Sequence, residues 1–358
     1  MNGSFSKRFL AKLLGKLLSP VKTSAPLALD AINSVLILRN DALGDAVVTT
    51  PLWRTLKQAK PQLRIGVLAS AGNAEVLRAD PDIDEVHVLE QKLLADLKTI
   101  RRIRSVPWDV TFCLKYNNKT SSALQARRLA PGSITSTVAF NDDPRYDLMF
   151  SIVSRQRRTD GDHMTEVIRK HLKAVIAVNT SEWHPTITIP ASNLEHVKVL
   201  LATMNAYAGF IHLNLHASLA IREWSMDNVI GFCKAFRAAR VDLGIVVTGD
   251  PSRIASEGVA LEREAIAGVL VLPSLSQLDL CAVVRASALV VTPDTSLTHI
   301  ASAERKPVVT LHYRKNEWFP YDVPHEIIYA SDERSVHSIP VSKVIASVDA
   351  LLPHVFSN

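Results

Sequence analysis

Two carboxylates and a glycine lie close together where the first apolar run of the sequence ends, in Arg39-Asn40-Asp41-Ala42-Leu43-Gly44-Asp45. A dinucleotide-binding fingerprint or a phosphate-binding loop would need more glycines here, and the latter also a Lys-Ser/Thr pair. Carboxylates repel phosphate, but they can accept a proton from a hydroxyl nucleophile, and Gly44 would allow backbone or substrate to come close. The alternative is structural, because Asp41 or Asp45 could cap the following helix.

Small and polar residues follow a second apolar run, in Asp294-Thr295-Ser296-Leu297-Thr298-His299. The pattern predicts a strand, a turn and a helix start. Free amides of Thr295, Ser296 and Leu297, together with the positive end of the helix dipole, would favour a diphosphate there. We expect Asp294 to cap this helix, and His299 could either donate to a phosphate or pack inward.

A cationic candidate lies in His216-Ala217-Ser218-Leu219-Ala220-Ile221-Arg222-Glu223-Trp224. Arg222 could neutralise a departing diphosphate, with Ser218 as a further donor contact, or Arg222 could form only a surface salt bridge. A polar loop with aromatic residues follows the run 308–311 and starts with His312, Tyr313, Arg314 and Lys315. An Asp-x-Asp in the segment 80–84 is of the kind that metal-dependent sugar transferases use, but its place before a strand favours a structural turn.

Alternating strands and helices must position these segments. Short, continuously apolar runs predict strands at 35–38, 65–69, 85–89, 110–114, 210–215, 243–248, 269–272, 289–292 and 308–311. Helical patterns lie between them at 46–58, 73–79, 92–104, 119–130, 227–239, 252–265, 277–286 and 297–303, and Ser276-x-x-Asp279 has the form of a capping box. This alternation predicts an α/β fold of two Rossmann-like doubly wound domains facing across a cleft, with ligands at the carboxyl ends of the strands.

The expected organisation has five parts. They are a basic amphipathic tail (1–33), a first Rossmann-like domain (34–185), a linker (186–208), a second Rossmann-like domain (209–330) and a C-terminal helical segment (331–358). No apolar run approaches the roughly 20 residues of a membrane span, and no cleavable leader is apparent, so we expect a cytoplasmic protein. Three cysteines lie far apart, which indicates neither a disulfide framework nor a metal knuckle.

Nearly all of the net charge of +6 belongs to the tail. Lys7, Arg8, Lys12, Lys16 and Lys22 stand before Asp30 without one carboxylate among them, and leucines recur there at helical spacing. The functional interpretation is a helix lying in an anionic membrane surface, on the cytoplasmic face of an inner membrane. The alternatives are a helix packed on the protein itself or a leader without structure. Nucleic acid is not an expected partner, since no binding motif is present.

Taken together, the motifs resemble those of the ADP-heptose:lipopolysaccharide heptosyltransferases, glycosyltransferase family 9, with the GT-B fold. The resemblance depends on residues 39–45 followed by Val47, Val48, Thr49, Thr50 and Pro51, on Asp80-Pro81-x-Ile83-Asp84-Glu85-Val86, and on Asp294-Thr295-Ser296-Leu297-x-His299 with Lys306-Pro307-Val308-Val309. It implies an inverting transfer of a sugar, with ADP-heptose as donor and a lipopolysaccharide core or related lipid-linked acceptor. It also implies that the domain 34–185 is the acceptor side and that the domain 209–330 binds the nucleotide sugar. No metal or cofactor is implied.

The resemblance also implies roles for particular residues. Asp45 would be the base, supported by Asp41 and Gly44, while Arg222 would assist the leaving group and Asp294 to His299 would bind its diphosphate. Two departures concern the donor: Ser296 replaces the usual glycine, and His312-Tyr313-Arg314 stands where many members have Tyr-Gly-Pro-Thr. Two alternatives stay open, a nucleotide-sugar epimerase of the same shape and a non-catalytic nucleotide-sugar-binding protein at a membrane.

Overall fold

The computed structural model describes residues 20–90, 93–115, 119–157 and 161–356. The chain forms two compact units, Met1–His184 and Pro185–Asn358. The amphipathic helix expected in the tail, with Lys7, Arg8, Lys12 and Lys16, lies outside the described residues.

The first unit is built on a six-stranded parallel sheet in its described residues, with strand order β4-β3-β2-β5-β6-β7. Its strands are β2 (Ser34–Arg39), β3 (Arg64–Ala69), β4 (Glu85–Val88), β5 (Val110–Cys113), β6 (Ile134–Ala139) and β7 (Ile152–Arg155). Its helices are α2 (Leu43–Val47), α3 (Thr50–Ala59), α4 (Ala74–Arg78), α5 (Leu93–Arg104), α6 (Lys119–Leu129) and α7 (Met164–Val175), with the shorter turns η1 (Leu29–Ala31) and η2 (Pro144–Leu148). The order is that of a doubly wound Rossmann sheet, in which the chain switches direction between the first and fourth strands.

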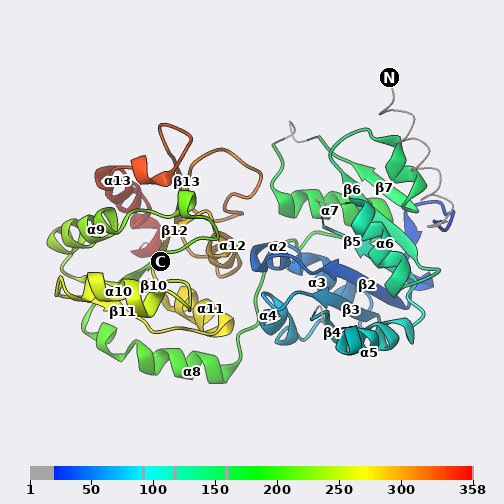
Figure 1. Cartoon of the computed structure of the whole chain (residues 1–358), viewed down its shortest axis with the longest axis horizontal. Coiled ribbons are helices and arrows are strands. Elements are labelled where there is room, and N and C mark those ends of the chain that lie inside the picture. Colours follow the sequence, from blue (N-terminus) through cyan, green and yellow to red (C-terminus); the bar gives the residue numbers. More distant parts are fainter. Residues whose placement is uncertain (1–19, 91–92, 116–118, 158–160, 357–358) are drawn as a thin grey trace. The chain divides into compact units, whose positions relative to one another are not determined.

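Helices cover the first sheet because its strands are apolar on both faces. Leu36 and Leu38 of β2 pack with apolar residues of α5 and α6 in one cluster, whereas α3 and α7 contact each other (Figure 1). All six residues of β2 are buried, which is typical of a central parallel strand. The strand that carries the acidic turn is therefore among the most firmly held elements of this unit.

The segment that precedes β2 is attached to the first unit by a short pair of parallel strands, β1 (Leu27–Ala28) and β8 (Ile176–Ala177). The buried Lys60, at the end of α3, holds the same segment: its ammonium donates to the backbone oxygens of Asp30, at 3.0 Å, and Ile32, at 2.7 Å. The segment from Leu27 onward is thus part of the folded unit rather than of the tail.

The second unit repeats the same strand order in its own described residues, β11-β10-β9-β12-β13-β14, all parallel. Its strands are β9 (Gly209–Asn214), β10 (Leu243–Thr248), β11 (Val269–Val271), β12 (Leu289–Pro293), β13 (Val308–His312) and β14 (His325–Tyr329). Its helices are α8 (Ala191–Leu200), α9 (Met226–Ala239), α10 (Ile254–Glu262), α11 (Gln277–Ala286), α12 (Ser296–Ala303), α13 (Val341–Leu351) and α14 (Pro353–Phe356), with the turns η4 (Ala202–Ala206), η5 (Ala220–Arg222) and η6 (Val336–Ser338).

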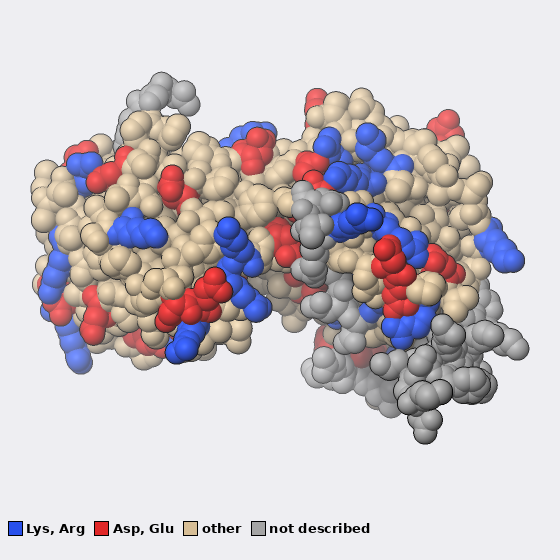
Figure 2. Space-filling view, turned by 90° about the horizontal axis from the view of Figure 1, so that it is seen from above, with Lys and Arg blue, Asp and Glu red and all other residues tan. Residues whose placement is uncertain are grey.

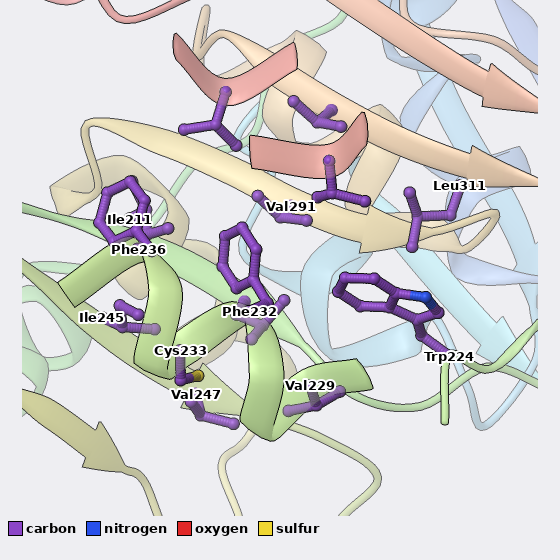
Figure 3. Packing of buried hydrophobic residues seen from close by; sticks show 14 of the residues in the cluster. Ile211, Trp224, Val229, Phe232, Cys233, Phe236, Ile245, Val247, Val291 and Leu311 are labelled. Atoms are coloured by element: carbon purple, nitrogen blue, oxygen red, sulfur yellow. The ribbon is translucent and has the colours of Figure 1, made fainter. Parts of the chain in front are cut away.

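Aromatic residues fill the core on one face of the second sheet. The ring centroids of Phe232 and Phe236 on α9 lie 5.7 Å apart, and Trp224 lies 6.0 Å from Phe232. Figure 3 shows these rings beside strand residues such as Val291 and Leu311. Burial of large rings contributes most of the stabilisation of such a core, so this face is a rigid support for the loops above it.

Several predicted elements differ from the observed ones. The helix expected at 46–58 is divided into α2 and α3, and the prediction missed β6, β7, α7 and β14. The expected linker 186–208 contains α8, which packs on α11 within the second unit. The capping box is formed on its first side, because Ser276 Oγ accepts from the Asp279 amide at 3.1 Å. The Asp279 carboxylate instead accepts from Asn193, at 2.8 Å, which attaches α8 to α11.

Charged side chains of both signs are interspersed on the surface that Figure 2 shows. No helix in the described part of the chain is long and apolar enough to cross a membrane.

Candidate functional site

A fully buried guanidinium organises the acidic turn of the first unit. Arg39 is the last residue of β2 and is 0% exposed. It donates from Nε to the Asp45 carbonyl oxygen at 2.8 Å and from one terminal nitrogen to Asp45 Oδ1 at 3.1 Å, while the other lies 3.2 Å from Asp41 Oδ2. It also donates to the Leu114 carbonyl just beyond β5, so it spans the point where the strand order reverses.

The backbone of this turn is held from the neighbouring strand. Asn73 is completely buried, and its side-chain amide donates to the carbonyl oxygens of Arg39, at 2.9 Å, and Asp41, at 3.3 Å. The hydroxyl of Ser70 donates to the Asp41 carbonyl at 2.7 Å. Both come from the segment after β3, so two adjacent strand ends fix the turn. The sequence pattern indicated none of these roles for Arg39, Asn73 or Ser70.

The two carboxylates of the turn have different environments. The side chain of Asp41 is 16% exposed and that of Asp45 is 21% exposed. Burial raises the pKa of Asp41 to about 6, and the negative charge of Asp45 adds to this shift while Arg39 opposes it. Neither Asp41 Oδ1 nor Asp45 Oδ2 receives a hydrogen bond from the described residues, but only Asp41 Oδ1 is among the buried oxygens. Asp45 is therefore the carboxylate with an oxygen available for a proton.

The capping interpretation of these aspartates is wrong. Helix α2 begins at Leu43 with Ala42 as its N-cap, and no side chain caps it. Asp45 lies within the first turn of the helix, and its carboxylate is directed to Arg39 instead of to the helix amides. Gly44 is a buried residue of the same turn.

A second aspartate–arginine pair lies at the corresponding edge of the other sheet. Arg222 NH1 is 3.5 Å from Asp294 Oδ2 and 3.5 Å from the Asp294 carbonyl oxygen, so two of the predicted residues are brought together. The Asp294 side chain is 9% exposed and also accepts from Asn316 Nδ2 at 3.1 Å. Asn214 donates to Thr292 Oγ1 at 3.2 Å, which joins the ends of β9 and β12. Arg222 thus belongs to a half-buried site and not to a surface salt bridge.

The start of α12 differs from its prediction. The N-cap is Thr295, not Asp294, because Thr295 Oγ1 accepts from the Leu297 amide at 3.2 Å. The Leu297 amide is therefore not free for a phosphate, and its side chain is buried. Ser296, the first helical residue, is half-buried. The imidazole of His299 is buried, with its ring centroid 5.8 Å from that of Trp318 in an edge-on arrangement.

The loop that carries Arg222 is anchored at both ends. Trp224 lies in the core and donates from its indole to the Ile339 carbonyl at 2.9 Å. Glu223 accepts from the Ala217 amide at 3.0 Å and pairs with Arg253, at 2.6 Å. Ser218 lies in this loop and is exposed, and no contact in the described part of the chain indicates that it binds the sugar donor. Glu223 and Arg253 are positioning residues that our sequence analysis missed.

A buried histidine extends this anchor to the loop after β10. His216 Nδ1 accepts from the Asp250 amide at 2.7 Å, so Nε2 carries the proton and donates to Glu257 at 2.9 Å. Glu257 in turn pairs with Arg253 at 2.7 Å. A Cβ at Gly249 would lie 2.3 Å from His216 Nδ1, so this position requires glycine.

The aspartates of segment 80–84 have structural roles. Asp80 accepts from the indole of Trp53 at 2.8 Å, and Asp84 pairs with Lys57 at 2.8 Å, so the turn is attached to α3. Burial raises the pKa of Asp80. In the described residues no three His, Cys, Asp or Glu side chains are grouped so that they could hold a metal ion.

The family model described as glycosyltransferase family 9 (heptosyltransferase) matches residues 97–337. That range is well over half of the sequence. The chain belongs to glycosyltransferase family 9. The match begins within α5, so it includes Arg222 and the α12 segment but not the acidic turn around Asp45.

Solved structures of this family have the same fold. The glycosyl transferase family 9 protein from Veillonella parvula superposes with a TM-score of 0.74 at 18% identity, over 90% of this chain and 97% of that one. E. coli heptosyltransferase WaaC with ADP has a TM-score of 0.69 at 16% identity, over 88% of this chain and 99% of that one. E. coli ADP-heptose lps heptosyltransferase II has a TM-score of 0.69 at 21% identity, over 90% of this chain and 99% of that one. The enzyme thus has the GT-B fold of two Rossmann-like domains.

A more distant likeness concerns the epimerase alternative. A UDP-N-acetylglucosamine 2-epimerase from Methanocaldococcus jannaschii gives a TM-score of 0.51 at 13% identity, over 89% of this chain and 92% of that one. No curated protein sequence matches the chain. The family match makes the chain a glycosyltransferase.

Proposed function

We propose that this glycosyltransferase moves heptose from ADP-heptose, with inversion at the anomeric carbon and without a metal, to a lipopolysaccharide core or a related lipid-linked acceptor. The observation that carries the proposal is the opposite exposure of the two aspartate–arginine pairs. The first unit buries its guanidinium and leaves carboxylate oxygen accessible, whereas the second buries its carboxylate and leaves guanidinium accessible. One edge is suited to a proton and the other to an anion.

The first edge would activate the acceptor. In the proposed step the open Oδ2 of Asp45 takes the proton of an acceptor hydroxyl, whose oxygen then forms the new bond to the anomeric carbon. Arg39 keeps Oδ1 occupied at 3.1 Å and so fixes which oxygen faces the substrate. The bond from the anomeric carbon to the diphosphate breaks in the same displacement, and its electron pair leaves with the nucleotide.

The second edge would stabilise the leaving group. Negative charge develops on the diphosphate as the sugar bond breaks, and a preorganised guanidinium and helix amides stabilise that charge. Arg222 is held by Asp294 at 3.5 Å. The Leu297 amide donates to the Thr295 hydroxyl, so the backbone amides that are left at the start of α12 are those of Thr295 and Ser296. We assign the diphosphate to these groups and not to Leu297.

The donor and acceptor assignments depend on the family and on charge. Structural relatives include one determined with ADP and one described as an ADP-heptose enzyme, which supports adenine as the base. Exposed arginines of the first unit would attract a phosphorylated acceptor, and these are Arg101, Arg102 and Arg104 of α5 with Arg127 and Arg128 of α6. Lys119 is instead buried, where it donates to Thr137 at 3.0 Å and burial lowers its pKa to about 8.

The test combines binding with turnover. Calorimetry with ADP, UDP and GDP should show that ADP binds more tightly than the other two by about tenfold or more. Incubation of the protein with ADP-heptose and a heptose-deficient lipopolysaccharide should release ADP only when the acceptor is present. Conversion of the donor without acceptor would favour the epimerase, and tighter binding of UDP would overturn the adenine assignment.

We further propose that the basic tail holds this enzyme at the cytoplasmic face of an anionic inner membrane. Because Leu27 and Ala28 pair with β8, a truncation should end before them. Removal of residues 1–22 should release the protein from vesicles that contain anionic lipid, while turnover of a soluble acceptor is retained. Co-sedimentation of the truncated protein with those vesicles would contradict the proposal.

A further inference from the structure

Two arginines contact the same aromatic ring in the second unit. Arg222 Cζ lies 5.9 Å from the ring centroid of Tyr313, and Arg314 Cζ lies 5.0 Å from it. Tyr313 follows β13 directly, is half-buried and packs against the core cluster that contains Trp224. The ring is therefore a fixed platform, and cation–π attraction holds both guanidiniums near it.

The two guanidiniums differ in what neutralises them. Arg222 is paired with Asp294, whereas Arg314 is exposed and makes no ion pair within the described part of the chain. An exposed arginine ordinarily loses much side-chain freedom when it binds a ligand, and stacking on a fixed ring reduces that loss. Arg314 is thus a preorganised cation without an anionic partner among the described residues.

The loop that holds Arg314 is attached to the proposed diphosphate site. Asn316 Nδ2 donates to Asp294 Oδ2 at 3.1 Å, and Asn316 Oδ1 accepts a hydrogen bond from the Trp318 amide at 2.9 Å. The Tyr321 amide donates to Ser302 of α12 at 3.0 Å. These contacts connect the loop to the residue that precedes the N-cap of α12 and to the last turn of that helix. The residues that make them directly follow His312-Tyr313-Arg314, where the sequence departs from the usual motif.

We propose that Arg314, held on Tyr313 beside Arg222, is a second guanidinium for the diphosphate of the donor and makes the site prefer nucleoside diphosphates to monophosphates. The inference rests on the proposed function, because it assigns more of the same donor site. A diphosphate carries more charge and more acceptor oxygens than a monophosphate, and a planar guanidinium can bind two of those oxygens at once. A second arginine therefore discriminates by the number of phosphates.

Calorimetry with ADP and AMP tests the assignment. Arg314→Ala should weaken ADP binding by about tenfold or more, since a charge-assisted hydrogen bond is lost, and should weaken AMP binding by less than about threefold. Arg263→Ala is the matched control, because Arg263 is also an exposed arginine of the second unit, at the end of α10. Equal losses for ADP and AMP, or an unchanged ADP affinity, would overturn the proposal.

Substitutions of the ring test the platform separately. Tyr313→Phe keeps the ring and should bind ADP as the wild type does, whereas Tyr313→Leu should reproduce most of the loss seen with Arg314→Ala. If both ring variants bind ADP normally, Arg314 does not depend on the stack and the proposal is wrong in that respect. Failure of the proposed function is distinguishable: the unchanged protein would then bind none of ADP, UDP and GDP, and the role of Arg314 would fall with it.

Discussion

The two units have the same strand order and place an aspartate–arginine pair at the same edge, but they bury opposite members of it. In the first unit Arg39 is 0% exposed, and the carboxylates of Asp41 and Asp45 are 16% and 21% exposed. In the second, the Asp294 side chain is 9% exposed and that of Arg222 is 27% exposed. The member that is buried is neutralised by the protein, and the other keeps bonding capacity for a ligand.

This difference shows how one topology can support two chemistries. Arg39 extends from the end of the central strand and is enclosed by the turn that follows it, and both carboxylates of that turn pair with it while they stay partly exposed. Arg222 lies in a loop anchored by Trp224, and reaches Asp294 from outside its strand. The buried partner lies at the end of a central strand in each unit, Arg39 in the first and Asp294 in the second. The more exposed partner therefore has the opposite charge in the two units.

The largest effect is expected at the open carboxylate. Asp45→Asn should reduce kcat by roughly 10³-fold, because an amide cannot accept the proton of the acceptor hydroxyl, while it can still accept a hydrogen bond from Arg39. Binding of ADP, measured by calorimetry, should stay within about twofold. Asp82→Asn is the control, since Asp82 belongs to the same unit and pairs with Arg54. Full turnover in Asp45→Asn would eliminate Asp45 as the base.

The same substitution in the two pairs should have different consequences. Arg222→Ala should lower kcat by about 100-fold, because one donor to the developing charge is lost, and it should cost less stability than Arg39→Ala, because Asn316 still donates to the buried Asp294 carboxylate. Arg39→Ala should cost about 3–5 kcal/mol of stability, because it removes a fully buried guanidinium together with its hydrogen bonds and leaves two partly buried carboxylates without their counter-charge. Urea unfolding and steady-state kinetics on both variants measure this contrast. Similar unfolding midpoints for the two would show that burial does not separate their roles.

Much of this arrangement could be predicted from residue patterns, and the failures have physical reasons. Continuous apolar runs are enough to place β2 and β9, since central parallel strands are buried on both faces. The pattern is weaker for β7 and β14, which lie at the edges of their sheets and carry polar residues. The helical pattern of α7 was missed because it lies in a basic, less regular stretch.

The sequence pattern named Asp45, Asp294 and Arg222 as candidates, but it did not predict the contacts that hold them. Aspartates after a strand can cap the next helix, and sequence spacing cannot distinguish that from a pair with the preceding arginine. Arg39 contained the missing signal, since a charged residue that ends a fully buried strand requires anionic partners nearby. Thr295 took the cap expected of Asp294 because Asp294 is engaged by Arg222 and Asn316, contacts that come from segments distant in sequence.

A smaller effect concerns the pH dependence of turnover. Wild-type kcat/KM should fall as the pH drops below about 6, because burial raises the pKa of Asp41 to about 6 and the protonated Asp41 no longer offsets the positive charge of Arg39 beside the reacting hydroxyl. Asp41→Asn has no such group, so its kcat/KM should be about threefold to tenfold lower at pH 8 and should lack the inflection near pH 6. An unchanged inflection in the variant would assign it to another group.

The smallest effect is on stability, and it has the opposite sign. Because the pKa of Asp41 is raised from 3.8 to about 6 on folding, the folded state binds more protons between these values, and stability falls as the pH rises through that window. Asp41→Asn escapes this loss, so at pH 7.5 it should be more stable than the wild type by about 1–3 kcal/mol, and at pH 4 the two should nearly coincide. Urea unfolding at both pH values measures the gap. A gap that persists at pH 4 would mean that the amide stabilises the turn by its hydrogen bonds and not by removing charge, and the contrast between the two pairs would then depend on geometry alone.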